Sequence, residues 1–320
     1  MILRGVASAL PPHKFDSKTV AGWCESDNTF LCQKVGIHSR YLLSMEESEL
    51  DLAHLACRNL FLQNPDLDRN AIGLCIYVGQ IKTRLIPHAS ALLQAHLGLP
   101  VTCACFDVGL ACSGYTYALI IAQSLMTTQN IKHALIVTCE PYSQIINRRD
   151  KNTAPLFGDA ASATWLSSSG RGLLLNSCSD FGTDGSKADY LEYTPSSLSD
   201  SAYLSMDGRG IFNFVMHNVP ISLSRCLQKA NLTLDDIDCF LFHQANRFIL
   251  ETLCDILQIP EKKCPIEVAE VANTVSSSIP LLLAKFLPLF NPGQRVVLCG
   301  FGGGLSWATT LAKFSEVPNE

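Results

Sequence analysis

The stretch "DVGLACSGYTYAL", residues 107–119, places a cysteine among small residues where a strand-like segment gives way to an apolar helix. Gly109 precedes Cys112, and Ser113 and Gly114 follow it, which allows a sharp turn and the approach of a bulky substrate. A helix start favours a thiolate, because free backbone N–H groups and the helix dipole lower the thiol pKa. The apolar residues behind Cys112 predict a buried helix that carries it into the middle of the molecule. Cys112 is therefore either a nucleophile or one more small core residue.

The composition indicates a globular protein with enough apolar material for a large core. The chain has 320 residues, of which 48% are hydrophobic and 17% charged, and its net charge is −5. Nucleic acid and anionic membrane surfaces are not expected partners, because no basic run is present. No segment reaches the roughly 18 apolar residues of a membrane span. With no export signal recognised at its beginning, the expected location is the cytoplasm.

The 14 cysteines do not indicate a disulfide scaffold or a metal site. Most lie inside apolar runs, such as Cys75 in "GLCIYVG" and Cys299 in "VVLCGFG". There is no CxxC pair and no cysteine–histidine cluster with zinc spacing, so no metal is expected. We expect most cysteines to be reduced core residues.

Strand-like and helix-like segments alternate along the chain, which predicts an α/β fold with buried parallel strands. A similar rhythm before and after about residue 165 suggests two related halves, residues 1–168 and 169–320, which meet in a turn at 167–170. The clearest strands are expected at 71–79, 133–141 and 171–182, the clearest helices at 49–63 and 216–232, and two strands around a glycine turn at 294–314.

Three further motifs carry candidate chemistry. His243, in "FHQAN", follows an apolar strand and is either a hydrogen-bonded structural residue or an acid, base or oxyanion donor. Asn273, in "VANTVSSSIPLLLA", is either a turn or cap residue or a neutral donor to an oxyanion. The glycine turn "GFGGGLSW" at 300–307 offers backbone N–H groups to a substrate carbonyl, and it lacks the spacing of a nucleotide-binding loop.

The ordered set "ACSG", "FGD", "GTDGS", "HQAN", "NT…SIP" and "GFGGGLSW" resembles the β-ketoacyl-(acyl-carrier-protein) synthase III family of the thiolase superfamily. The resemblance implies a five-layered αβαβα fold of two similar halves, usually in a homodimer. It implies acyl-CoA or acyl-carrier-protein thioesters as substrates and no permanently bound cofactor.

The resemblance also implies the role of each motif. Cys112 would take an acyl group from a thioester. His243 and Asn273 would bind the thioester oxygen of a malonyl-type extender and assist its decarboxylation, and the carbanion would then attack the acyl-Cys112. The N–H groups of Cys112 and Gly303 would form the oxyanion hole. The alternatives are an acyltransferase that passes the acyl group to a β-keto acid, amine or alcohol without decarboxylation, and a catalytically silent partner subunit.

The binding positions that the resemblance implies depart from the family pattern in several places. Phe30 replaces a tryptophan and Lys151 an arginine that sandwich adenine, and Asn213, Phe248 and Asp255 replace basic residues that dock the carrier protein. A specialised pathway is therefore expected at least as much as fatty-acid initiation. The implied residues are Phe30, Lys34, Lys151, Arg209 and Asn246 for the coenzyme or carrier arm, and Ile86, Phe157 and Phe212 for the acyl pocket.

Overall fold

The computed structural model describes residues 1–195 and 203–316. One nine-stranded sheet organises these residues, and two small two-stranded sheets stand beside it. The strands are β1 (Ile2–Ala9), β2 (His13–Asp16), β3 (Ser39–Leu42), β4 (Ile72–Val78), β5 (Ala104–Val108), β6 (His133–Cys139), β7 (Ala161–Ser167), β8 (Arg171–Thr183), β9 (Leu191–Glu192), β10 (Ser205–Met206), β11 (Cys239–Phe242), β12 (Arg295–Gly302) and β13 (Ser306–Glu316). The helices are α1 (Ser17–Trp23), α2 (Asn28–Phe30), α3 (Glu49–Gln63), α4 (Ala89–Leu97), α5 (Ala111–Thr128), α6 (Gly208–Lys229), α7 (Arg247–Leu257) and α8 (Ser278–Phe286).

The large sheet consists of two sections with the same internal order. One section runs β1-β7-β6-β4-β5 and the other β8-β13-β12-β11, and they join where Ile2 and Leu3 of β1 pair with Leu174 and Leu173 of β8. In each section two antiparallel pairings come first, and a parallel pairing follows: β6 with β4 in one, β12 with β11 in the other. The fold therefore has two similar halves.

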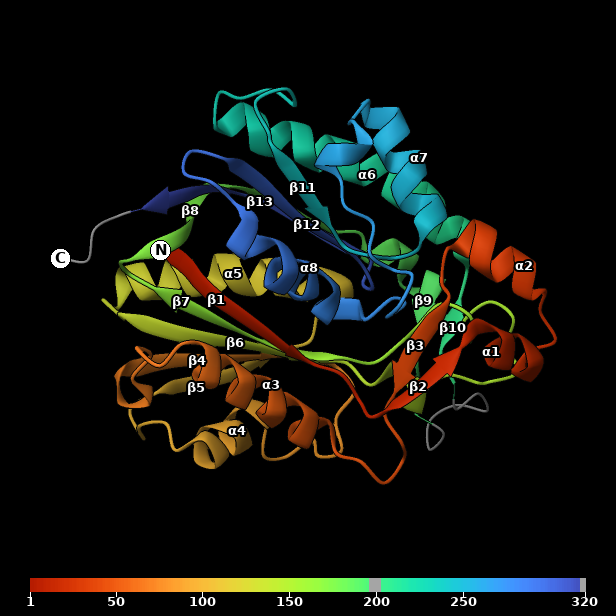
Figure 1. The fold of residues 1–320 in the computed structure, drawn as a ribbon, viewed down its shortest axis with the longest axis horizontal. Coiled ribbons are helices and arrows are strands. Elements are labelled where there is room, and N and C mark those ends of the chain that lie inside the picture. Colours follow the sequence, from red (N-terminus) through yellow and green to blue (C-terminus); the bar gives the residue numbers. More distant parts are fainter. Residues whose placement is uncertain (196–202, 317–320) are drawn as a thin grey trace.

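Three apolar cores separate five layers (Figure 1). The central core holds α5 and α8 between the two sheet sections. A second core lies between the first section and the helices α3 and α4, and a third lies between the second section and the helices α6 and α7. This layering confirms the expected αβαβα architecture. It also places the start of α5 at the middle of the molecule.

The elements expected from the sequence are present, and the boundaries of α6 differ most from those expected. Helix α3 has the predicted bounds, whereas α6 begins at Gly208, eight residues before the predicted start. The carboxylate of Asp207 caps this earlier start, because it accepts the N–H groups of Arg209 and Gly210 at 3.0 Å each. The proposed boundary between residues 168 and 169 falls in the turn between β7 and β8 and stays a prediction. Within residues 1–195 and 203–316, no helix is long and apolar enough to cross a membrane.

A buried residue of the central helix α5 should contribute more to the free energy of unfolding than an exposed residue of the outer helix α3. Leu119 of α5 is 1% exposed, whereas Leu62 of α3 is 77% exposed. We expect Leu119→Ala to lower the free energy of unfolding by about 2–5 kcal/mol, because it leaves a cavity between the two sheet sections. Leu62→Ala should change it by less than about 0.5 kcal/mol. Urea titration followed by circular dichroism measures both, and equal effects would contradict the central position of α5.

Candidate active site

Cys112 is the second residue of α5, at the end of a sharp turn from β5. The residue before it, Ala111, has φ of 44°, a left-handed conformation that costs an alanine of order 1–3 kcal/mol. The turn directs Cys112 inward, and its side chain is buried beside the end of β12. The sequence-based expectation of a cysteine at a buried helix start is met.

Two glycines of β12 make this approach possible. A Cβ atom on Gly300 would lie 2.8 Å from the carbonyl oxygen of Cys112. A Cβ atom on Gly302 would lie 2.8 Å from the Cβ and 3.0 Å from the Sγ of Cys112. Since ordinary van der Waals contact begins near 3.4 Å, no side chain fits at either position. The glycine turn therefore lies directly against the thiol.

The pKa of Cys112 is raised, although a helix start by itself lowers the pKa of a thiol. Burial raises the pKa, and the nearby Glu140 adds to this effect, so that the pKa reaches about 12. The backbone groups of Gly303 and of Cys112 itself lower it, but they do not offset the loss of water. Burial therefore outweighs the helix terminus in the unliganded chain.

His243 follows β11 directly and is also buried. Its Nδ1 lies 2.7 Å from Oγ of Ser278, and its ring meets the ring of Phe301 edge-on, with 5.4 Å between centroids. Burial lowers the pKa of His243 to about 3, so the imidazole is neutral at physiological pH. Ser278 was not singled out in the sequence, although it lies in the serine run after Asn273.

Asn273 is held by both its backbone and its side chain. Its N–H donates to the carbonyl of Leu156 at 3.0 Å, and its own carbonyl accepts the N–H of Gly158 at 2.9 Å. Its Oδ1 accepts the N–H of Val275 at 2.9 Å, which leaves the amide NH₂ as the free donor. Val275 has φ of 52°, which is a strained conformation for a β-branched residue.

The three residues line one small cavity. Cys112, His243 and Asn273 face a volume of about 120 Å³, and Phe157 forms part of its wall as predicted. The arrangement offers a thiol, a neutral imidazole and an amide donor in one dry site. Within residues 1–195 and 203–316 there is no group of three or more histidine, cysteine or acidic side chains that could hold a metal ion.

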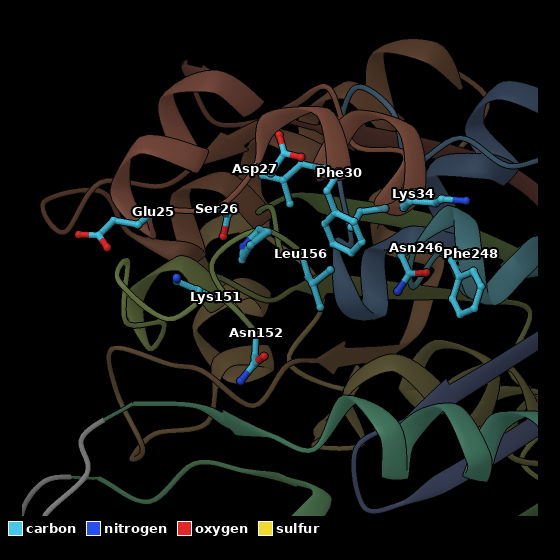
Figure 2. Close-up of a pocket in the computed structure, with 13 residues that line it drawn as sticks. Glu25, Ser26, Asp27, Phe30, Lys34, Lys151, Asn152, Leu156, Asn246 and Phe248 are labelled. Atoms are coloured by element: carbon cyan, nitrogen blue, oxygen red, sulfur yellow. The ribbon is translucent and has the colours of Figure 1, made fainter.

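A larger cavity of about 760 Å³ adjoins this site, since Leu156 and Asn246 line both (Figure 2). Figure 2 shows Phe30 and Leu156 on its wall, with Lys151 to one side and Asn246 to the other. The structure thus brings together four of the five positions predicted to bind the coenzyme or carrier arm: Phe30, Lys34, Lys151 and Asn246.

Three predicted positions lie elsewhere. Arg209 lines neither cavity, because it belongs to the capped first turn of α6. Phe212 stacks on Phe248, with 5.5 Å between centroids, instead of reaching the inner cavity. Ile86 is 90% exposed, so within this chain it does not line an acyl pocket. Periodicity and motif order cannot report how a side chain is directed, so the roles of these three positions stay predictions.

Asp159 of the "FGD" motif, residues 157–159, hydrogen-bonds backbone segments near the site. Asp159 is buried, and its carboxylate accepts the N–H groups of Leu43 at 2.8 Å and of Ser143 at 3.1 Å. Burial raises the pKa of Asp159 to about 6 in spite of these donors. The carboxylate of Asp159 therefore ties three separate segments together, whereas Phe157 of the same motif lines the inner cavity.

The last cavity near the site lies beside the glycine turn. It has a volume of about 630 Å³ and is bordered by Gly303 and Gly304, by Tyr142 and Leu191, and by the loop that follows β4. Leu191 also borders the inner cavity, so the two spaces adjoin at this residue. Among the described residues, Phe30, Lys34 and Lys151 border the larger cavity but not this one, and Lys82 borders this one.

The comparisons with known proteins agree with this geometry. Two family models match, described as 3-oxoacyl-[acyl-carrier-protein (ACP)] synthase III over residues 106–185 and as the C-terminal part of the same synthase over residues 227–314. A β-ketoacyl-[acyl-carrier-protein] synthase III of Limosilactobacillus reuteri (strain DSM 20016) is 32% identical over 322 residues, which cover 98% of each chain. The enzyme of that name from Lactococcus lactis is 33% identical, covering 96% of this chain and 97% of the other.

Solved structures give the same result. The 3-oxoacyl-(acyl carrier protein) synthase III of Pseudomonas aeruginosa PAO1 superposes with a TM-score of 0.89 at 27% identity, covering 99% of both chains. A priming β-ketosynthase from the R1128 polyketide biosynthetic pathway has the same TM-score and identity, covering 99% of this chain and 97% of the other. The chain therefore belongs to the β-ketoacyl-[acyl-carrier-protein] synthase III family of the thiolase superfamily, as the order of its motifs implied.

Proposed function

We propose that Cys112, His243 and Asn273 carry out the condensation that makes this chain, like its family, an acyltransferase acting on acyl thioesters. The observation that carries the proposal is the single buried cavity that all three side chains line. The relatives named β-ketoacyl-[acyl-carrier-protein] synthase III, matched over almost the whole chain, support the same reaction class.

The first half-reaction is acyl transfer to Cys112. The sulfur attacks the thioester carbonyl of acyl-CoA or acyl-carrier protein, the bond to the departing sulfur breaks, and that sulfur takes up the proton which Cys112 loses. Negative charge develops on the carbonyl oxygen, and the N–H groups of Cys112 and Gly303 are the donors for it. Such donors are worth most in a site without water, because they need no rearrangement as the charge develops.

The second half-reaction is decarboxylation of a malonyl-type thioester followed by carbon–carbon bond formation. When CO₂ leaves, the thioester oxygen takes up negative charge, and His243 and the amide NH₂ of Asn273 donate to it. Nδ1 of His243 and Oγ of Ser278 lie 2.7 Å apart, and when the hydroxyl donates in this pair, Nε2 carries the imidazole proton and can donate to the thioester oxygen. The carbanion then attacks the acyl carbonyl, and Cys112 leaves as a thiol after taking up a proton.

We assign different parts of the substrate to the larger cavity and to the cavity beside Gly303. The larger cavity suits the coenzyme or the carrier arm, because Phe30 offers a ring to stack on and Lys34 and Lys151 offer positive charge to phosphate. The cavity beside Gly303 suits the acyl chain. Phe248 stands where the family has a basic residue, so docking of an acidic carrier protein depends on its neighbours, such as Arg247.

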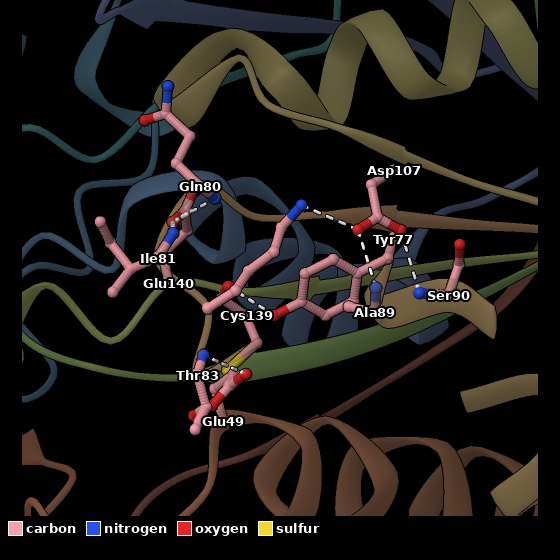
Figure 3. Close-up of polar contacts among 11 residues, drawn as sticks. Glu49, Tyr77, Gln80, Ile81, Thr83, Ala89, Ser90, Asp107, Cys139 and Glu140 are labelled. Carbon is pink, nitrogen blue, oxygen red and sulfur yellow. Dashed lines mark hydrogen bonds and ion pairs between the residues drawn. The ribbon is translucent and has the colours of Figure 1, made fainter. Parts of the chain in front are cut away.

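A homodimer is also proposed, and the loop after β4 supports it. Three carboxylates hold this loop (Figure 3). Glu140 accepts the N–H of Gln80 at 3.0 Å, Glu49 that of Thr83 at 2.9 Å, and Asp107 those of Ala89 and Ser90 at 2.9 Å each. The loop is thus ordered, yet it presents Leu85 and Ile86, which are 82% and 90% exposed.

The neighbouring strand gives the second reason for a dimer. β5 is the last strand of the large sheet, and its residues Cys105, Phe106 and Asp107 are half-buried. An open strand edge beside ordered apolar side chains is a surface that proteins normally cover. A second copy of this chain covers both features. We further propose the cytoplasm as the location, because all 14 cysteines are free, as in a reducing compartment.

The nucleophile can be identified by intact mass. After incubation with a panel of acyl-CoAs, the wild-type protein should gain the mass of one acyl group, and Cys112→Ala should gain none. Cys299→Ala is the matched control, because Cys299 is also buried and burial also raises its pKa to about 12. The control should acylate like the wild type. Loss of the adduct in Cys299→Ala but not in Cys112→Ala would contradict the assignment.

Decarboxylation can be separated from acylation. His243→Ala and Asn273→Ala should still take up the acyl group but release CO₂ from a radiolabelled malonyl thioester at least about a hundredfold more slowly, since each loses a donor to the developing charge. An acyl product formed from a non-malonyl acceptor without CO₂ release would support the alternative acyltransferase reaction instead.

The oligomeric state can be tested at the exposed loop. Sedimentation velocity should give a dimer for the wild type and a monomer for the double variant Leu85→Glu, Ile86→Glu, because two buried charges oppose association. Leu289→Glu, at another residue that is 66% exposed, should remain dimeric. A monomeric wild-type protein at micromolar concentration would rule the dimer out.

A further inference from the structure

Two buried hydroxyl groups join the first turn of α5 to the glycine turn. The Oγ atoms of Ser113 and Ser306 lie 2.7 Å apart, and both residues are fully buried. Ser306 Oγ also lies 2.8 Å from the carbonyl oxygen of Gly303, and Ser113 Oγ lies 3.0 Å from that of Leu110. Each hydroxyl therefore stands between its partner hydroxyl and a backbone carbonyl beside the thiol.

There are more close oxygen–oxygen contacts here than hydroxyl protons to make hydrogen bonds in them. Two hydroxyls carry two protons, whereas three close oxygen–oxygen contacts are present. If Ser113 donates to Ser306, then Ser306 donates to Gly303 and the carbonyl of Leu110 loses its hydroxyl. If the direction reverses, Ser306 donates to Ser113 and the carbonyl of Gly303 is left without its donor. In the third arrangement each hydroxyl donates to its own carbonyl, and the contact between the two Oγ atoms carries no proton. Ser306 contacts the carbonyl of Gly303 directly and Ser113 does not, so the two serines differ in how they restrain Gly303.

The backbone of the glycine turn needs a hydrogen bond that limits its rotation. Gly302 and Gly304 have φ of 153° and 131°, and three consecutive glycines have no side chain with which to fix their backbone. Gly303 follows Gly302, on which a Cβ atom would lie 3.0 Å from the sulfur of Cys112, and the Gly303 backbone favours the thiolate form of that sulfur. A small rotation of this turn would direct the N–H of Gly303 away from the reacting atoms.

We propose that Ser306 is a positioning residue, whose hydroxyl fixes the Gly303 backbone and thereby the N–H that this glycine directs at Cys112. The proposal rests on the acyl-transfer step proposed above. It assigns Ser113 a secondary role, because Ser306 retains its own proton and its bond to Gly303 when Ser113 is replaced. It concerns acylation of Cys112 and not decarboxylation, whose donors lie on His243 and Asn273.

The test compares three serine-to-alanine variants in single-turnover acylation by an acyl-CoA that acylates the wild type, followed by intact mass. Ser306→Ala should slow acylation on the order of ten- to a hundredfold, which is less than the loss of a whole oxyanion donor. Ser113→Ala should stay within about threefold of the wild type. Ser222→Ala is the matched control, because Ser222 is buried and its hydroxyl pairs at 2.8 Å with Thr309 on the same strand β13.

Two further measurements separate positioning from general damage. The pH at which iodoacetamide alkylates Cys112 should move upward in Ser306→Ala, because a misdirected N–H no longer stabilises the thiolate. The rate of malonyl-thioester decarboxylation should be unchanged, and Ser306→Thr, which keeps the hydroxyl, should restore acylation. Should Ser306→Ala fail to fold, Ser306→Cys tests the same point, since a thiol fills the space but donates weakly.

The outcomes are distinct. Wild-type acylation in Ser306→Ala, or equal slowing in Ser306→Ala and Ser113→Ala, would overturn the positioning role. Equal slowing of acylation and decarboxylation in Ser306→Ala would also overturn it, because it would indicate a general distortion. A wild-type protein that takes up no acyl group from any donor would instead remove the proposed function itself.

Discussion

The close approach of β12 to the first turn of α5 is the contact on which the site depends. Gly300 and Gly302 allow the strand backbone to lie where any side chain would collide with Cys112. Because α5 and β12 belong to different halves of the fold, this contact also sets how the halves fit together around the central core. The thiol and the backbone donor beside it are therefore positioned by one packing contact.

Burial gives the site its chemical character. It raises the pKa of Cys112 and lowers that of His243, so the unliganded site holds a neutral thiol and a neutral imidazole. A site of uncharged donors is suited to a reaction in which negative charge appears only as the reaction proceeds. Fixed charge of both signs stays in the outer cavity, where Lys34 and Lys151 are accompanied by Glu25 and Asp27.

The architecture could be predicted from the sequence more fully than the surroundings of the site. Hydrophobic periodicity locates α3, and motif order groups Cys112, His243 and Asn273, which line one cavity in the structure. The sequence could not show that burial outweighs the helix terminus at Cys112, because desolvation depends on residues distant in the chain. For the same reason Ile86 was placed in a pocket that its own chain does not form.

The similar environments of Cys112 and Cys299 have a consequence for reactivity. Burial raises both thiol pKa values to about 12, so acidity does not distinguish the two residues. The two residues differ in whether a substrate-sized molecule can reach them. Cys112 borders a cavity that adjoins the outer one, whereas Cys299 borders none of the cavities described. Access therefore distinguishes Cys112 from Cys299, and acidity does not. An electrophile small enough to enter the core without passing through the outer cavity would not distinguish the two.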